Sequence, residues 1–192
     1  EIAKTEGAYQ SFQNCPAHLG KLQFDLWNHT PTSIYDWESL KQSIKTHGLR
    51  NSLLVACMPT ASTAQINGNT ESFEPRTSNL YVRRVLSGEF VIMNRYLESA
   101  CRKINRWDKK LIDNIIANKG SIQNTDLPQE MKNTFKTVWE MSQKSLIDLS
   151  VGRAPFVCQS QSLNLYISQP TRNILTSMHF YAWRKGLKTG IY

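Results

Sequence analysis

One apolar run constrains the fold more than any other feature of this sequence. The run Asn51-Ser-Leu-Leu-Val-Ala-Cys57 has the length of a strand, and its hydrophobic side chains do not alternate with polar ones. A strand with one solvated face alternates, whereas a strand covered on both faces does not. The run therefore predicts a strand buried on both faces, as in a parallel sheet, and Pro59 is expected to end it.

Helix signals precede and follow this strand. Residues 36–47 are predicted to be helical, because Trp37, Leu40 and Ile44 share one face and Gly48 stands where a left-handed C-cap belongs. Further helices are predicted over residues 1–5, 96–104, 108–118, 128–151 and 171–188, and further strands over 79–86, 90–93 and 163–167. Strands separated by helices indicate an α/β architecture with at least partly parallel pairing.

Composition excludes several classes of protein. The chain has 192 residues, 40% of them hydrophobic, which suits one sizeable core or part of a larger one. It has no apolar run of membrane-spanning length and no secretory signal, and its four cysteines lack metal-ligand spacing. Reduced thiols in a cytosolic protein are expected. The net charge of +8 is scattered in pairs of bases, which favours a solvated surface over a nucleic-acid face.

Both ends look cut, so a fragment of a longer protein is expected.

The segment that follows the predicted strand is the most informative for chemistry. Residues 60–65 are small or hydroxylic, and they lie at the C-terminal end of a buried strand, where α/β proteins bind ligands. Small residues let the backbone approach an anion, and a helix that begins here would direct free N–H groups at it. An ordinary Ser/Thr helix cap, which needs no ligand, is the alternative interpretation of the same residues.

Longer motifs resemble the large subunits of class I ribonucleotide reductases. The pattern Trp37-x2-Leu40-x7-Gly48-Leu49-Arg50-Asn51-x3-Val55-Ala56-x2-Pro59 is similar to the signature of that family, and Met58-Pro-Thr-Ala-Ser-Thr-Ala-Gln65 resembles its loop for the substrate diphosphate. Blocks in family order cover nearly the whole chain: Phe73-Glu-Pro75, Thr77-Ser-Asn79, Arg83-Arg-Val-Leu-Ser-Gly-Glu-Phe90, Gly120-Ser-Ile-Gln123, Lys136-Thr-Val-Trp139, Gln159-Ser-Gln-Ser-Leu-Asn164, Thr176-Ser-Met-His-Phe-Tyr181 and Gly186-Leu-Lys-Thr-Gly190.

The resemblance implies a fold and a reaction. Residues 1–192 would be a single fragment of the catalytic barrel domain, the C-terminal portion of a ten-stranded α/β barrel. The whole subunit would reduce ribonucleoside diphosphates to deoxyribonucleoside diphosphates by cysteine thiyl chemistry, with the radical and redox cysteines upstream of Glu1. The implied partners are a small subunit holding a metal-radical cofactor, thioredoxin or glutaredoxin, and a second large subunit in a homodimer. ATP, dATP and other dNTP effectors would bind outside this segment, which itself would bind no metal or cofactor. A cytoplasmic enzyme without membrane or nucleic-acid contacts is expected.

Two functional elements carry over residue by residue. Thr60, Ala61, Ser62 and Thr63 match the loop that holds the substrate phosphates by hydroxyl and backbone N–H groups. Tyr192 matches the first of two adjacent tyrosines that relay the radical from the small subunit to the active-site cysteine. The fragment alone is expected to be inactive, because it lacks the radical cysteine.

Several positions depart from the family pattern. Cys57 stands where a proline is common, Arg76 replaces a usual tyrosine, Cys158 takes a position usually held by aspartate, and Asn67 fills a usually apolar site. None of the four cysteines matches a redox position. A non-catalytic, degenerate homologue that acts as a protein-binding scaffold is therefore the alternative function, and an upstream radical-cysteine loop would distinguish the two.

Overall fold

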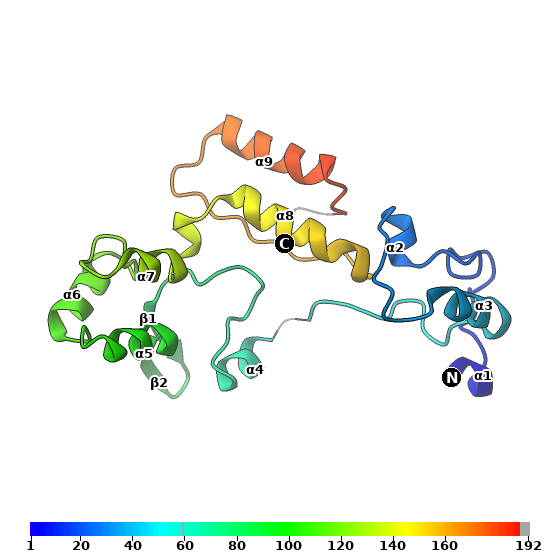
Figure 1. Cartoon of the computed structure of the whole chain (residues 1–192), viewed down its shortest axis with the longest axis horizontal. Helices are drawn as coiled ribbons and strands as arrows, with labels where there is room; N and C mark the ends of the chain where they lie inside the picture. The colour runs from blue at the N-terminus through cyan, green and yellow to red at the C-terminus, as the bar shows by residue number, and fades with distance from the viewer. Residues whose placement is uncertain (59, 189–192) are drawn as a thin grey trace. The chain divides into compact units, whose positions relative to one another are not determined.

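In a computed structural model of the chain, the described residues are 1–58 and 60–188. They divide into two compact units (Figure 1). Unit 1 comprises residues 1–58, 146–164 and the described residues from 173 onward, and unit 2 comprises residues 60–145 and 165–172. No helix among these residues is both long and apolar enough to cross a bilayer.

Unit 1 is helical. Its elements are α1 (Ile2–Glu6), α2 (Gln23–Leu26), α3 (Trp37–His47), most of α8 (Gln143–Arg153), the short 3-10 helix η2 (Ala154–Phe156) and α9 (Arg172–Arg184). The prediction for α3 is confirmed at both ends. The Asp36 carboxylate accepts the Ser39 N–H at 3.0 Å, and Gly48 ends the helix with φ of 78°. The predicted helices at the two ends of the chain are confirmed as α1 and α9.

The predicted strand over residues 51–57 is wrong for the described structure. The single sheet among the described residues lies elsewhere, and Leu53, Leu54 and Val55 are 52%, 63% and 48% exposed. Two hydrogen bonds join this segment to Cys158: its N–H donates to Val55 O at 3.0 Å, and its Sγ accepts the Leu54 N–H at 3.4 Å. The strand predicted over 163–167 is wrong for the same reason. An apolar run identifies side chains that are favourably buried. A strand also needs a neighbouring strand with which its backbone can form a hydrogen-bonded ladder.

Unit 2 has the larger apolar core. It contains α4 (Ala61–Ile66), β1 (Leu80–Val85), β2 (Gly88–Met93), α5 (Arg95–Lys103), α6 (Lys109–Ala117), α7 (Gln129–Thr134) and the 3-10 helix η1 (Val138–Glu140). The core residues are Leu97, Cys101, Leu111, Ile115, Ile122 and Leu127. The predictions for α5, α6, β1 and β2 are confirmed. The two strands form an antiparallel hairpin, so the parallel pairing expected from the sequence is not present among the described residues.

The single long helix predicted over 128–151 is wrong, because polar side chains interrupt it. After α7 the Glu140 carboxylate accepts the Thr137 N–H at 2.8 Å, and the Gln143 amide donates to the carbonyls of Val138 and Met141, each at 3.1 Å. These contacts satisfy backbone groups that a continuous helix would have used. Val138 is fully buried and its N–H donates to Arg76 O at 2.9 Å. Tertiary contacts therefore stabilise the interruption between α7 and α8.

A buried amide holds the hairpin to the helices of unit 2. The Asn79 side chain is 2% exposed, and its Nδ2 donates to the carbonyls of Gly120 and Phe135 at 3.0 and 2.9 Å. Asn94 donates to Asn79 Oδ1 at 2.8 Å and also caps α5. Each buried polar atom of Asn79 thus has a partner, which is the condition for a polar group inside a core.

Candidate functional site

The predicted phosphate loop lies at the first turn of α4. Thr60 is the N-cap residue with φ of −124° and ψ of 31°, and its side chain makes no capping hydrogen bond. Its carbonyl accepts the Ala64 N–H at 2.7 Å and the Thr63 hydroxyl at 3.4 Å. The interpretation of Thr60 as an ordinary hydroxyl cap is therefore wrong for this structure.

The loop residues are accessible. Thr60, Ala61, Ser62 and Thr63 are all exposed, whereas Ala64, the next residue, is 7% exposed and packs into unit 2. The first N–H groups of a helix have no acceptor within it. The structure thus brings the four predicted residues together as a short exposed turn with three hydroxyls and with backbone donors.

Two arginines fix the other end of α4. Arg95 Nη2 donates to Asn67 O at 3.0 Å, and Arg76 Nη2 donates to Gly68 O at 3.2 Å. Gly68 has φ of 68°, and a Cβ atom there would lie 2.6 Å from the Arg95 guanidinium carbon. Arg76 and Asn67, two departures from the family pattern, therefore take part in this anchor. No pattern in the sequence indicates that Arg76 and Arg95 bind the end of the loop helix.

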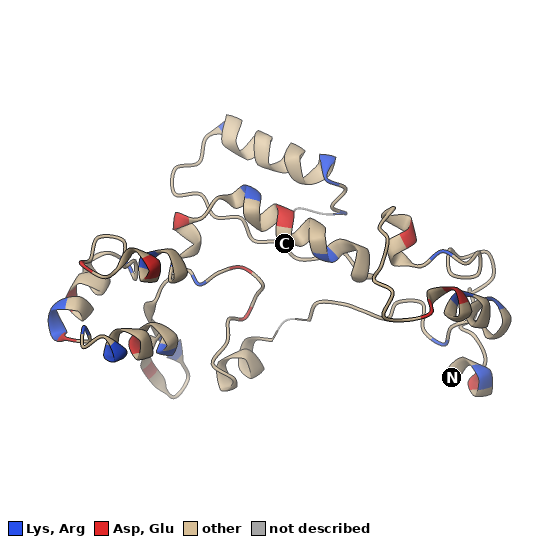
Figure 2. Cartoon of the chain, in the orientation of Figure 1, with Lys and Arg blue, Asp and Glu red and all other residues tan. Residues whose placement is uncertain are grey.

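The loop itself has no charged side chain. Figure 2 shows Lys and Arg spread over many elements, with none on α4. A phosphate at this turn would be bound by neutral hydroxyl and amide donors from the chain itself. Among the described residues no group of three or more His, Cys, Asp or Glu side chains could hold a metal ion.

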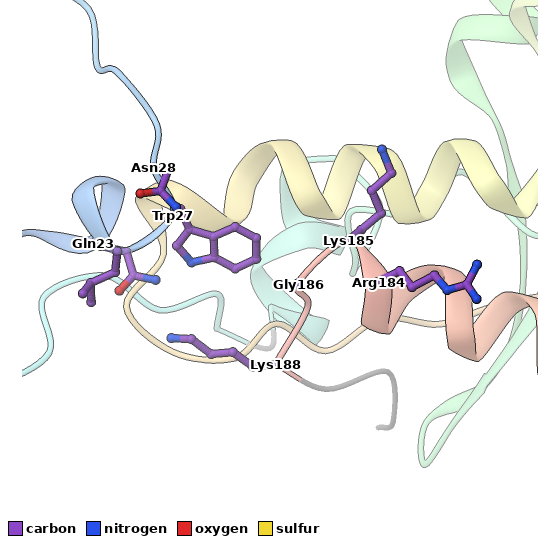
Figure 3. A pocket seen from close by; sticks show the side chains of 8 residues that line it. Gln23, Trp27, Asn28, Arg184, Lys185, Gly186 and Lys188 are labelled. Atoms are coloured by element: carbon purple, nitrogen blue, oxygen red, sulfur yellow. The ribbon is translucent and has the colours of Figure 1, made fainter.

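Tyr192, the predicted relay residue, lies outside the described residues. The chain that leads toward it is described up to Lys188, which follows the end of α9. A cavity of about 430 Å³ lies there, beside Trp27 (Figure 3). Lys188 Nζ donates to the carbonyl of Cys158 at 3.0 Å. In the sequence, Lys188 is distinguished only by its position in the family block Gly186-Leu-Lys-Thr-Gly190. That block does not indicate which residue the lysine contacts.

Two thiols have a shifted pKa, in opposite directions. Burial opposes ionisation of Cys15, but hydrogen bonds from the Tyr9 hydroxyl and from backbone N–H groups outweigh it and lower the pKa of the thiol. Burial raises the pKa of the Cys101 thiol in the core of unit 2. The spacing of the four cysteines in the sequence does not distinguish Cys15 or Cys101 from Cys57 and Cys158.

Comparison with known proteins gives consistent results. Residues 1–192 match a family model described as the barrel domain of ribonucleotide reductase. The chain is 54% identical to the ribonucleoside-diphosphate reductase large chain of Cryptosporidium parvum, over all of this chain and 24% of that protein. It is 52% identical to the large subunit of Vaccinia virus and 51% identical to that of Danio rerio, over 25% and 24% of those proteins. The chain thus spans about a quarter of the length of these curated relatives.

A solved structure supports the same fold. The alpha subunit of the class Id ribonucleotide reductase of Actinobacillus ureae superposes with a TM-score of 0.67 at 25% identity, over 92% of this chain and 36% of that one. The family match and this likeness confirm the α/β barrel class predicted from the sequence, although the buried strands of that prediction do not form among the described residues.

Proposed function

The chain belongs to the ribonucleotide reductase family as part of its barrel domain, and on that premise we propose that it provides the substrate-phosphate loop and the start of the radical relay of a large subunit. That subunit reduces ribonucleoside diphosphates to deoxyribonucleoside diphosphates. The names of the relatives support the reaction class. The exposed, uncapped turn at Thr60 is the structural observation on which the assignment to this segment rests.

The loop binds the diphosphate through neutral donors. The Ser62 hydroxyl and the backbone N–H groups of the first turn donate to phosphate oxygens, and the Thr63 hydroxyl does so by exchanging its long 3.4 Å bond to the Thr60 carbonyl for one to the phosphate. Hydrogen bonds to a charged group contribute about 1.5–3 kcal/mol each, roughly twice as much as neutral ones. Arg76 and Arg95 hold the carbonyls at the far end of α4, so the turn is already shaped before the substrate arrives.

Tyr192 passes the oxidising equivalent onward. A phenol that loses an electron and its proton together stays neutral, so the radical can move without creating a charge on the tyrosine. In this proposal the hole arrives from a metal-radical cofactor in a partner small subunit and ends on a cysteine outside this segment. Thioredoxin or glutaredoxin supplies the reducing equivalents, and ATP, dATP and other dNTP effectors act at sites elsewhere in a homodimeric, cytoplasmic large subunit.

Removal of two loop hydroxyls tests the phosphate site. In a full-length large subunit that carries this sequence, Ser62→Ala with Thr63→Val should weaken diphosphate binding about tenfold or more. A nucleoside without phosphates should bind equally to both proteins. The matched control is Thr32→Val with Ser33→Ala, an exposed Thr-Ser pair outside the loop. An unchanged Kd for the diphosphate would refute the loop assignment.

Loss of one phenol tests the relay. A Tyr192→Phe subunit keeps the ring and should bind substrate normally, but its turnover with the small subunit should fall to background. Near-normal turnover would contradict the relay assignment. A loss of both substrate affinity and turnover would indicate misfolding. That result would also count against the relay assignment.

A further inference from the structure

The phosphate loop, residues 60–63, is attached to the rest of unit 2 through the C-terminal half of α4. Ala64 is the buried residue of that helix, at 7% exposed. The Asn67 N–H donates to Thr63 O at 3.1 Å, and the Asn67 carbonyl accepts Arg95 Nη2 at 3.0 Å. Asn67 therefore joins Thr63, the last residue of the loop, to the first residue of α5.

The Arg95 side chain is oriented by its own neighbours. Arg95 begins α5, a helix whose Leu97 and Cys101 are fully buried in the core of unit 2. Its guanidinium carbon lies 5.0 Å from the centre of the Tyr96 ring, and Nη2 also donates to the Tyr96 hydroxyl at 3.0 Å. A planar guanidinium that is held in this way loses little freedom when it binds a further acceptor. The core thus presents a preformed donor to the end of α4.

Gly68 makes room for this guanidinium. Its φ is 68°, and a Cβ atom there would lie 2.6 Å from Arg95 Cζ and 2.8 Å from Nη1. A side chain at this position would therefore displace the guanidinium from Asn67 O. The Gly68 carbonyl in turn accepts Arg76 Nη2 at 3.2 Å. Two arginines thus bind successive carbonyls at the C-terminal end of α4, where a helix leaves its carbonyls without acceptors of its own.

We propose that Arg95 is a positioning residue for the substrate diphosphate: by holding Asn67 O against α5 it aligns the donors of residues 60–63. This inference rests on the proposed role of the loop. The loop has no charged side chain, so its affinity depends on the geometry of neutral donors. Hydrogen bonds weaken steeply as their angle departs from linear. Loss of Arg95 should therefore weaken the binding of the phosphates and leave the binding of the nucleoside portion unchanged.

The test uses a full-length large subunit that carries this sequence. Arg95→Met removes the donor and should raise the Kd of a ribonucleoside diphosphate on the order of tenfold, the effect of about one hydrogen bond to a charged group. The Kd of the unphosphorylated nucleoside should stay the same, which also reports that the protein is folded. Arg84→Met is the matched control, because Arg84 pairs with Glu89 of the hairpin at 2.7 Å. That variant loses the same charge from unit 2 without losing a bond to α4, and its Kd should be unchanged.

Gly68→Ala tests the same contact with every charge retained. The added methyl group displaces the Arg95 guanidinium, so the Kd of the diphosphate should rise while that of the nucleoside does not. Because both substitutions break one bond, the double variant should bind the diphosphate about as weakly as the weaker single variant. Losses that add in the double variant would show that the two residues act independently, which contradicts the proposal.

The outcomes separate this inference from the proposed function. A normal diphosphate Kd in Arg95→Met, with weakened binding in Ser62→Ala/Thr63→Val, would overturn the positioning role and leave the loop assignment intact. An unchanged Kd in the loop variant would refute the loop assignment, and the role of Arg95 with it. An equal rise in Arg84→Met would show an effect of charge alone. An equal loss of nucleoside affinity would show a general loss of structure, and either of these last two results also overturns the proposal.

Discussion

Among the glycines of the described residues, Gly120 is the one at which a Cβ atom would lie closest to another atom. Its φ is 86°, and a Cβ atom would lie 1.7 Å from the Ser78 hydroxyl and 2.9 Å from the Asn79 N atom. We predict that Gly120→Ala destabilises unit 2 locally by about 2–5 kcal/mol, from the sum of left-handed strain and overpacking. Hydrogen exchange in β1, α5 and α6 should speed up accordingly. Gly152→Ala is the control, because no atom lies within 4 Å of that Cβ position and alanine favours the helix; equal exchange rates in the two variants would contradict the prediction.

The Tyr9–Cys15 contact predicts a pH-dependent reactivity. The hydrogen bond to Cys15, followed by burial, raises the pKa of Tyr9 to about 12. Because Tyr9 holds its proton more tightly when folded, its contribution to stability is complete below about pH 10 and is lost as the pH rises through the folded value. The Tyr9 hydroxyl in turn lowers the pKa of the Cys15 thiol.

Tyr9→Phe removes that donor, so the pKa of Cys15 should rise. Alkylation of Cys15 near pH 8, where an ordinary thiol is partly ionised, should become slower. Mass spectrometry of the Cys15 peptide as a function of pH measures the effect, with the Cys158 peptide as the internal control. An unchanged alkylation profile would show that the phenol does not stabilise the thiolate.

Among the elements, those with local signals were predictable. Asp36 and Asp108 accept N–H groups of the turns that follow them, and the helices begin where these residues indicate. The prediction of a strand over residues 51–57 was wrong, since a strand depends on a partner distant in sequence and no such ladder forms there among the described residues. The interruption at Thr137 depends on contacts of Glu140, Gln143 and Arg76 that apolar periodicity does not encode.

The residues of the candidate site were also predictable only where the signal is local in sequence. The small and hydroxylic residues at 60–63, with the family resemblance, indicated the loop, and the structure shows them exposed on one turn. The bonds from Arg76 and Arg95 to the end of α4 and the bond from Lys188 to Cys158 join residues that are eight, 28 and 30 positions apart. No local pattern contains such contacts, so only the fold reveals them.

The cap of α6 makes an element-scale prediction. Asp108 Oδ1 accepts the Leu111 N–H at 2.8 Å. Asp108→Ala should cost about 1 kcal/mol of local stability, typical for the loss of an N-cap. Amides in the first turns of α6 should exchange several-fold faster with solvent. Asp113→Ala, at an exposed position within the same helix, should leave them unchanged; faster exchange in both variants would point to a general weakening of α6 instead.

At the scale of the whole molecule, the proposal predicts that these 192 residues do not suffice for catalysis. The radical cysteine and the redox cysteines belong to other parts of the large subunit in this proposal, and the relatives are about four times as long. The isolated chain, mixed with a competent small subunit and a thiol reductant, should yield no deoxyribonucleotide and should aggregate readily, because Leu53, Leu54 and Leu86 are exposed. The full-length subunit in the same assay is the positive control. Turnover by the isolated chain would contradict the proposal.

The contact between Leu54 and Cys158 cannot form until both residues have been synthesised. The two residues are 104 positions apart. At about 5–20 residues per second, a ribosome needs roughly 5–20 s to add the intervening residues. The apolar run at 53–55 therefore leaves the ribosome before Cys158, to which it hydrogen-bonds, has been made, and Lys188, which donates to the same cysteine, is made later still. The earliest time at which this junction can form is therefore set by translation rather than by the microseconds of helix formation.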